Sequence, residues 1–142
     1  MAVKQLSVFL ENKSGRLIDA VKTLADNKIN IRAMSIADTK DFGILRLIVS
    51  DAEKAKTALS DQVLCAITDV IAAEMKDEAG ALCGILDVLN KANINIEYMY
   101  AFTASTANGA YVVLRVDDNS VAESVLKKNG IATLNNDELL KM

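Results

Sequence analysis

The sequence of 142 residues contains no histidine, no proline and no tryptophan, and it has only 6 glycines and 2 cysteines. The absence of histidine removes the commonest general base, the Ser-His and Cys-His nucleophile pairs, and most zinc sites. The few glycines form neither a Walker-type nor a dinucleotide-binding pattern, so no phosphate-binding loop is indicated. We therefore expect no metal, no cofactor and no enzymatic activity.

Charge and hydropathy exclude further classes of partner. The net charge is −3, and neither the segment up to Ile71 nor the remainder is basic, which argues against binding to a nucleic-acid backbone. No apolar run approaches the roughly 20 residues that cross a bilayer, and the opening segment is too interrupted for a signal peptide. With 51% hydrophobic and 25% charged residues, the chain is expected to form a packed core in the cytoplasm, with no membrane partner.

The cysteines and two of the methionines are interpreted as core residues. Cys65 and Cys83 lack the spacing of a metal-binding or redox pair and stand in apolar surroundings, so we expect both to be reduced and buried. Met34 and Met99 are interpreted as core filling. Gly84 interrupts a helix-like segment, where glycine costs about 1 kcal/mol relative to alanine, and we expect close helix packing to compensate.

What the sequence does contain is a repeat, most visible in the tripeptide Ile-Asn-Ile, which occurs twice. An offset of 65 residues aligns Gly15 with Gly80. At this offset the identical pairs are Leu17 and Leu82, Leu24 and Leu89, Met34 and Met99, and residues 29–31 and 94–96. Further along, Gly43 matches Gly109 and Leu59 matches Leu126, with the extra residues in a loop-like stretch at 103–109. Agreement of this kind indicates an internal duplication.

Each copy has the order strand, helix, strand, strand, helix, strand. The assignment rests on alternating apolar residues in the strands and on apolar residues at helical spacing in the helices. The predicted strands are residues 4–11, 29–37, 44–50 and 63–68, then 70–76, 94–103, 109–116 and 131–134. The predicted helices are residues 15–28, 51–61, 80–92 and 120–129, with a last helical turn at 137–142. This order predicts an α+β protein of two ferredoxin-like βαββαβ units with antiparallel sheets.

The junction of the copies has no linker. Only Asp69 separates the last predicted strand of the first copy from the first strand of the second, so we expect one strand to run nearly straight into the other. The predicted domains are residues 1–69 and 70–142. A unit of about 70 residues has a thin core, and several strands are apolar on both faces. One face of each sheet therefore needs a partner, from the sister copy or a second chain, and we expect a homo-oligomer, most simply a dimer.

A turn with glycine precedes the first helix of each copy, in "ENKSGRL" (residues 11–17) and "KDEAGAL" (residues 76–82). One interpretation is that Gly15 and Gly80 only let the chain turn sharply. The other is that free backbone N–H groups at the start of the helix form an anion site, which a carboxylate fits. Glycine also permits a ligand to approach the backbone closely.

Asn30 and Asn95 stand at the start of the strand after the helix, each between two isoleucines. The carboxamide has two donors and an acceptor, so it could receive an ammonium group or support a carboxylate. Alternatively it only bonds the neighbouring backbone. Donors for a carboxylate combined with an acceptor for an ammonium describe a site for a free α-amino acid.

The repeated pattern resembles the tandem ACT-domain family over nearly the whole chain. Family members show an acidic residue or Asn, then x-Pro-Gly-x-Leu, a helix, and Ile-Asn-Ile. These positions correspond here to Asn12, Ser14, Gly15, Leu17 and residues 29–31, and to Asp77, Ala79, Gly80, Leu82 and residues 94–96. Since Ser14 and Ala79 replace proline, the chain departs from the family in its turns. The resemblance implies sheets paired side by side into one larger sheet of eight strands.

The resemblance also implies binding of an amino acid where two ACT domains meet, and regulation of amino-acid metabolism. The ligand-binding residues that it implies are Asn12, Ser14, Gly15, Arg16, Leu17, Asn30, Ile31, Asp77, Glu78, Ala79, Gly80, Ala81, Leu82, Asn95 and Ile96. We expect a free-standing sensor whose further partner could be an amino-acid biosynthetic enzyme. The alternatives are a regulatory subunit without a ligand response and, with less support, an acylphosphatase-like hydrolase using Arg16, where the second copy has Ala81.

Overall fold

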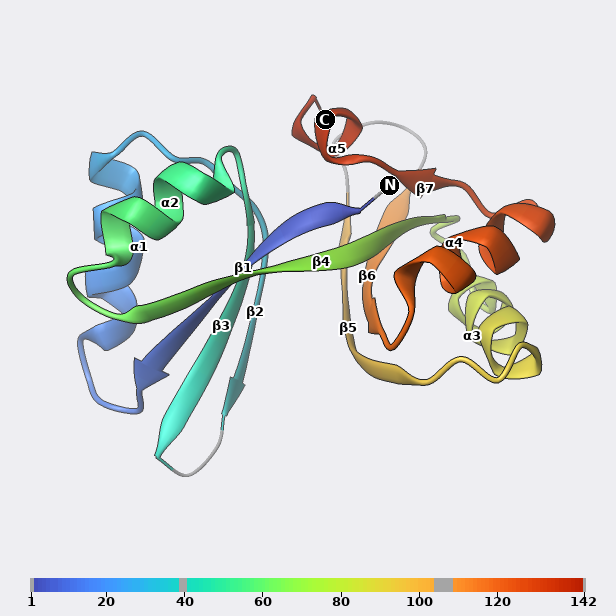
Figure 1. Cartoon of the computed structure of the whole chain (residues 1–142), viewed down its shortest axis with the longest axis horizontal. Helices are drawn as coiled ribbons and strands as arrows, with labels where there is room; N and C mark the ends of the chain where they lie inside the picture. Colours follow the sequence, from blue (N-terminus) through green and yellow to red (C-terminus); the bar gives the residue numbers. More distant parts are fainter. Residues whose placement is uncertain (1, 39–40, 104–108, 142) are drawn as a thin grey trace. The chain divides into compact units, whose positions relative to one another are not determined.

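The computed structural model describes residues 2–38, 41–103 and 109–141 (Figure 1). The chain divides into two compact units. One unit is Lys4–Thr68, and the other consists of the residues from Asp69 onward together with those up to Val3. Each unit has its own helices and encloses its own hydrophobic core.

The first unit is a four-stranded antiparallel sheet with α1 and α2 on one face (Figure 1). Its sheet order is β4-β1-β3-β2. Leu47 of β3 lies opposite Leu6 of β1 on one side and opposite Met34 of β2 on the other. Its elements are β1 (Val3–Glu11), α1 (Arg16–Asp26), β2 (Ile31–Asp38), β3 (Phe42–Val49), α2 (Ala52–Leu59) and the first part of β4 (Leu64–Met75).

The second unit repeats this plan. Its sheet order is β7-β4-β6-β5, again antiparallel in every ladder that joins described strands. Its elements are the second part of β4, α3 (Ala81–Lys91), β5 (Ile96–Thr103), β6 (Ala110–Val116), α4 (Asn119–Lys128), β7 (Thr133–Leu134) and α5 (Asn136–Leu140). The predicted α+β class and the two βαββαβ units are therefore confirmed.

Strand β4 replaces two predicted strands. It runs without interruption from Leu64 to Met75, so it ends the first unit and begins the second. Through it the described strands form one sheet of seven, as the prediction of a larger sheet requires, but with one strand fewer than the expected eight. The physical reason is the missing linker: with only Asp69 between two strand-forming segments, nothing breaks the extended chain.

Each unit encloses one apolar cluster between its sheet and its helices. In the first unit, Leu6, Val8 and Leu10 of β1 point inward, as their alternation predicted, and meet Leu24 of α1 and Leu59 of α2. In the second unit the central members are Ile71, Leu89, Val112, Leu114 and Leu126. Burial of one such side chain contributes about 1.5–3 kcal/mol.

Three predictions of burial are wrong, and so is the prediction of close packing at Gly84. Met34 lies on β2 and Met99 on β5, the outermost strands of their sheets, so both side chains are exposed. Cys83 is exposed on α3, because Ile85 and Leu89 define the buried stripe of that helix and position 83 lies outside it; Cys65 is half-buried, and both thiols are free. Gly84 has no atom within 4 Å of the position where a Cβ would stand, so close helix packing is not its explanation.

The repeated Ile-Asn-Ile follows a Schellman ending of the preceding helix. After α1, Lys28 takes a left-handed conformation (φ 58°) and the N–H of Ile29 donates to the carbonyl of Leu24 at 2.9 Å. After α3, Asn93 (φ 59°) and Ile94 repeat the geometry. The first isoleucine of each tripeptide thus closes the helix onto the core and the second begins the strand.

Candidate functional site

The two predicted glycine turns have nearly identical geometry. Gly15 has φ 88° and ψ −14°, and Gly80 has φ 89° and ψ −12°, both in the left-handed region. No atom lies within 4 Å of the Cβ position at either glycine, so the turn itself, not crowding, requires glycine. Both glycines occupy the N-cap of a helix that receives no hydrogen bond from a capping side chain.

The first turns of α1 and α3 therefore keep unused donors. In α1 the N–H of Arg16 donates to the carbonyl of Lys13 at 3.3 Å, whereas the N–H groups of Leu17 and Ile18 have no acceptor among the described residues. In α3 the same holds for Leu82 and Cys83, because Ala81 makes the only corresponding bond, to Glu78. These donors lie at the positive end of the helix dipole.

The other helices are capped by side chains. The carboxylate of Asp51 accepts from the N–H of Lys54 at 3.0 Å at the start of α2, and Asp118 accepts from Val121 at 3.2 Å at the start of α4. Asn135 does the same for α5, with 2.8 Å to the N–H of Glu138. Only the two helices that follow the glycine turns are left open within the described part of the chain.

The remaining residues of the predicted turns differ in their roles. The N–H of Asn12 donates to the carbonyl of Asp41 at 3.1 Å, which holds the turn against the end of the β2–β3 connection. The side chains of Ser14, Asp77, Glu78 and Ala79 are exposed. Exposed Leu17 and half-buried Leu82 begin the apolar faces of their helices rather than a polar site.

Asn30 and Asn95 do not join the glycine turns of their own units. Asn30 follows the C-terminal end of α1, and 11 helical residues, or about 16 Å, separate it from Gly15. Its backbone is bonded to Ser50 on both sides, at 3.0 Å and 2.9 Å, while its carboxamide is exposed. Asn95 lies equivalently after α3, also exposed. Ile31 and Ile96 are half-buried against the two cores.

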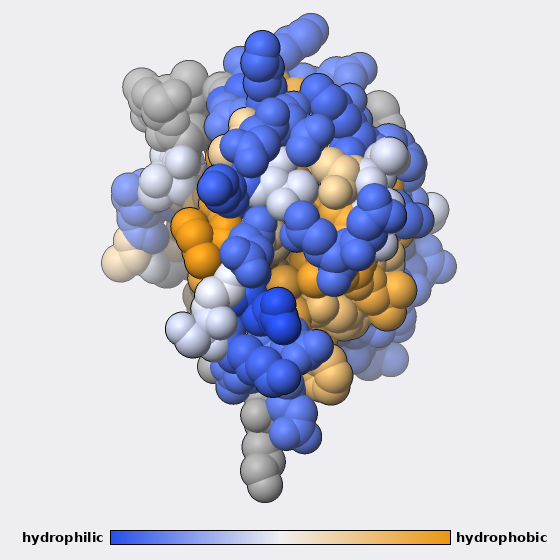
Figure 2. Space-filling view, turned by 90° about the vertical axis from the view of Figure 1, so that its left-hand side faces the viewer, coloured by the Kyte–Doolittle hydropathy of each residue, from blue (hydrophilic) through white to orange (hydrophobic). Residues whose placement is uncertain are grey.

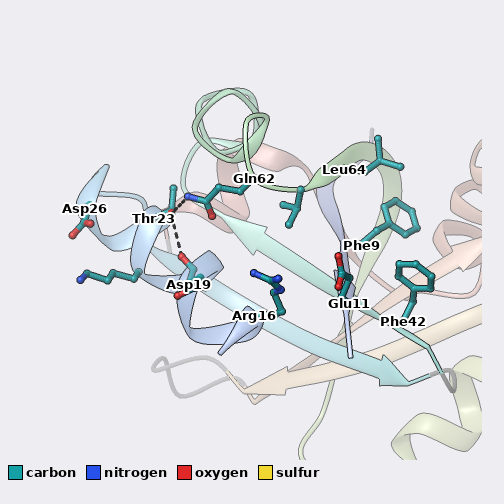
Figure 3. Close-up of a pocket in the computed structure, with 11 residues that line it drawn as sticks. Phe9, Glu11, Arg16, Asp19, Thr23, Asp26, Phe42, Gln62 and Leu64 are labelled. Carbon is teal, nitrogen blue, oxygen red and sulfur yellow. Dashed lines mark hydrogen bonds between the residues drawn. The ribbon is translucent and has the colours of Figure 1, made fainter. Parts of the chain in front are cut away.

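Beside the first glycine turn is a groove of about 670 Å³ that lies within the first unit (Figure 3). One wall is the face of α1 that carries Arg16, Asp19, Thr23 and Asp26, spaced so that they share one side of the helix. The Nε2 of Gln62 donates to the Oγ1 of Thr23 at 2.6 Å and ties this wall to the segment before β4. The groove has the size typical of a small-molecule site.

The groove has a charged part and an apolar part. The charged part contains side chains of both signs, namely Glu11, Arg16, Asp19, Lys22 and Asp26. The apolar part consists of Phe9, Phe42, Val63 and Leu64, of which Phe42 is 52% and Leu64 72% exposed. Figure 2 shows the molecule from the side on which α1 and α2 lie, and this surface is mostly hydrophilic, with hydrophobic patches among the hydrophilic residues.

Neighbouring positive charges favour the ionised form of Glu11. The Nζ of Lys13 lies 3.1 Å from its carboxylate, and this hydrogen bond, together with the positive charges of Lys13 and Arg16, lowers the pKa of Glu11 below its usual value. At neutral pH the groove therefore presents a carboxylate at the end of β1 and a guanidinium at the start of α1. Groups of opposite charge side by side suit a zwitterion.

A second groove, of about 350 Å³, occupies the equivalent position in the second unit. It is lined in part by Glu74, Ala81, Gly84, Val88 and Ile131. By the offsets of the repeat these residues correspond to Phe9, Arg16, Asp19, Thr23 and Leu64 of the first groove. The backbone plan is thus shared, whereas the chemistry of the two grooves is different.

Of the predicted site residues, the first groove contains Arg16, and the second contains Glu78 and Ala81. Sequence reasoning missed Asp19, Asp26 and the apolar residues Phe9, Phe42 and Leu64. A position-by-position comparison of the two copies held a signal for some of them, because polar residues of the first helix align with Gly84 and Val88 of the second. The convergence of four separate segments on one groove had no signal in the sequence.

Two further kinds of feature are not found in the described part of the chain. No group of three or more potential metal-ligating side chains occurs there. None of the helices in residues 2–38, 41–103 and 109–141 has both the length and the apolar character needed to cross a membrane.

Comparison with known proteins gives a family and a fold. The family model for the ACT domain pair matches residues 1–142. The crystal structure of protein BT0572 from Bacteroides thetaiotaomicron is 43% identical, with a TM-score of 0.92 over 100% of this chain and 98% of that one. The ligand-free regulatory subunit of aspartate kinase from Thermus thermophilus is 13% identical, with a TM-score of 0.65 over 89% and 90%, a likeness of fold alone. No curated protein matches the sequence.

Proposed function

The chain belongs to the family of ACT domain pairs, and from this premise we propose that it is a regulatory protein that binds a free amino acid. Binding of the amino acid then modulates an enzyme of amino-acid metabolism. We assign the protein no reaction of its own. We place its action in the cytoplasm, where free amino acids and biosynthetic enzymes meet.

The observation that carries this proposal is the pair of uncapped helix starts after Gly15 and Gly80. Two N–H groups in each first turn have no acceptor among the described residues, and both lie where the helix dipole favours negative charge. A carboxylate can accept both hydrogen bonds. The left-handed glycine ahead of them presents no side chain, so the ligand can reach the backbone.

We propose that the carboxamides of Asn30 and Asn95 act on a neighbouring chain. Each is exposed and lies at the far end of a helix from the turn of its own unit. In a homodimer the carboxamide of one chain can stand beside the glycine turn of the other and accept a hydrogen bond from the ammonium group. The site would then include residues of both chains.

Isothermal titration calorimetry of the purified protein against each of the twenty amino acids tests the proposal. A ligand at 100 times its Kd should also stabilise the folded state by about 2.7 kcal/mol, which a thermal shift detects. Asn30→Ala and Asn95→Ala should weaken binding and leave the unfolding midpoint of the free protein unchanged. No heat and no thermal shift with any amino acid at millimolar concentration would contradict amino-acid binding.

The alternative, a regulatory subunit that has lost its ligand response, is distinguished by its partner. The fold that the chain shares with a regulatory subunit of aspartate kinase makes a separate biosynthetic enzyme the partner to look for. Co-purification of such an enzyme, combined with no heat of binding for any of the twenty amino acids, would favour this alternative over the amino-acid sensor.

A further inference from the structure

We propose that the groove of the first unit is the binding site, that its ligand is an α-amino acid with an apolar side chain, and that the equivalent groove of the second unit does not bind it. This inference rests on the proposed function and narrows it to one copy of the repeat and one class of ligand. The inference is based on the residues that line the two grooves and on the charged side chains of the first groove that form no ion pair.

The charged part of the first groove suits the two charges of an amino acid. Arg16 begins α1, next to the unused N–H groups, and its planar guanidinium can bind a carboxylate through two hydrogen bonds. Asp19 follows one helical turn later on the same face, at the spacing where neighbouring side chains meet. Because an amino acid carries its carboxylate and ammonium on one carbon atom, Arg16 and Asp19 can bind both groups at once.

The charged side chains on this face of α1 are not engaged in ion pairs with the described residues. Arg16, Asp19 and Asp26 form no ion pair with any described residue. In the second unit, Lys91 and Asp87, which correspond to Asp26 and Lys22, pair with each other at 2.9 Å. Lys91 and Asp87 do not line the second groove, whose charged residues are Glu74, Lys76 and Glu78. The first groove thus presents, on the face of α1, unpaired groups of both signs.

The apolar part of the first groove determines the class of side chain. Phe9, Phe42 and Leu64 are 36%, 52% and 72% exposed, although residues of these types are normally buried. They lie on the strand side of the groove, opposite Arg16 and Asp19 of α1 (Figure 3). A ligand held by its charged end on α1 can cover this surface with an apolar side chain, and each covered Å² contributes about 25 cal/mol.

The second groove differs from the first in both its charged part and its apolar part. Ala81 and Gly84 replace the guanidinium and the carboxylate, and Glu74 replaces the aromatic ring of Phe9. Open N–H groups and the charged residues Glu74, Lys76 and Glu78 remain at the second groove, but no guanidinium or carboxylate stands at the helix positions of Arg16 and Asp19. No aromatic residue lines this groove. One ligand per chain is therefore expected.

Calorimetry with the full chain tests the inference, using leucine and phenylalanine as apolar ligands, with serine, glutamate and lysine for comparison. Leucine or phenylalanine should bind with one site per chain and at least tenfold more tightly than the polar amino acids. Arg16→Ala, which gives the first groove the residue of the second, should weaken binding at least tenfold, or about 1.4 kcal/mol. Lys76→Ala, at the counterpart of Glu11 in the second unit, is the matched control and should bind as the wild type does.

Phe42→Ala separates the class of ligand from general damage. It should weaken binding of phenylalanine at least fivefold and leave that of alanine unchanged, because alanine is too short to cover the ring. Thermal unfolding of each free variant reports whether the fold is retained.

The outcomes separate this inference from the proposed function. If no amino acid binds the wild type, both are overturned. If an amino acid binds but Arg16→Ala and Lys76→Ala affect it equally, or two ligands bind per chain, the proposed function stands and the assignment to the first groove is wrong. Preference for polar amino acids would refute the ligand class. A change in oligomeric state of Phe42→Ala without a change in affinity would make the apolar surface a contact between chains.

Discussion

At the scale of single residues, backbone conformation distinguishes the glycines that the fold requires from the one that it does not. Gly15 and Gly80 need a left-handed backbone, while Gly84 lies inside α3 and has open space around its Cβ position. Nothing in the turn geometry or in the packing requires glycine at position 84. Substitution by alanine should therefore change the stability differently at the three positions. The difference identifies the glycines that the turns require.

We predict that Gly15→Ala and Gly80→Ala each lower the free energy of unfolding by about 1 kcal/mol, because an L-residue is strained at positive φ. Gly84→Ala should raise it by about 1 kcal/mol, since alanine is the better residue in a helix interior. Guanidinium denaturation at constant m-value measures all three. Equal stability of Gly15→Ala and the wild type would show that the turn does not depend on glycine.

At the scale of the elements, the five helices of the described residues differ in how they begin and end. Helices α2, α4 and α5 have Asp or Asn side chains at the N-cap, and α1 and α3 have only glycine. At the other end, α1 and α3 close with Lys28 and Asn93 in the left-handed conformation, where α4 has Gly130. A helix that is open at its start and closed at its end leaves donors for a ligand only beside the turn.

Lys28→Gly is predicted to stabilise the protein by about 1 kcal/mol, since it relieves a left-handed lysine without removing a side-chain hydrogen bond found in the structure. Asn27→Gly, one residue earlier, is the matched control. Its φ of −95° needs no glycine, and its Nδ2 donates to the carbonyl of Thr23 at 2.8 Å, so this change should give no gain. Thermal denaturation of the two variants side by side decides whether the conformation, and not added flexibility, is responsible.

At the scale of the whole molecule, the chain is a duplicated unit whose copies have kept their backbone and changed their surfaces. Both units retain the strand order, the glycine turn and the helix ending, which serve the core. The grooves differ, with Arg16 and Asp19 in one and Ala81 and Gly84 in the other. Duplication followed by divergence of this kind leaves one scaffold with two grooves of different chemistry.

We predict that the protein is a homodimer and that the edge strand β2 contributes to the contact. Ile36 on β2 is 50% exposed, and β3 is the only described strand that pairs with β2. Because edge strands readily pair with another chain, Ile36→Lys should shift sedimentation towards the monomer. Val121→Lys on α4, where the wild-type side chain is 48% exposed, should not. A wild-type protein that sediments as a monomer at all concentrations would refute the prediction.

Local patterns were enough for most of the fold. Alternation placed Leu6, Val8 and Leu10 on the inner face of β1, and the repeat gave the order of the elements in both copies. These features depend on neighbours within a few residues along the chain, so they can be read from the sequence alone. The same locality explains why Gly15 and Gly80 were singled out.

The amino-acid sequence by itself determined that this protein is two copies of one βαββαβ unit with a glycine turn before the first helix of each. Only the tertiary structure decided that Asn30 lies a helix length from Gly15, that Met34 and Met99 face outward on edge strands, and that Phe9, Phe42 and Leu64 meet Arg16 around one groove. Periodicity shows which residues share a face of their own element. Which elements come together, and what their edges leave exposed, depends on the packing of segments that are distant in the sequence.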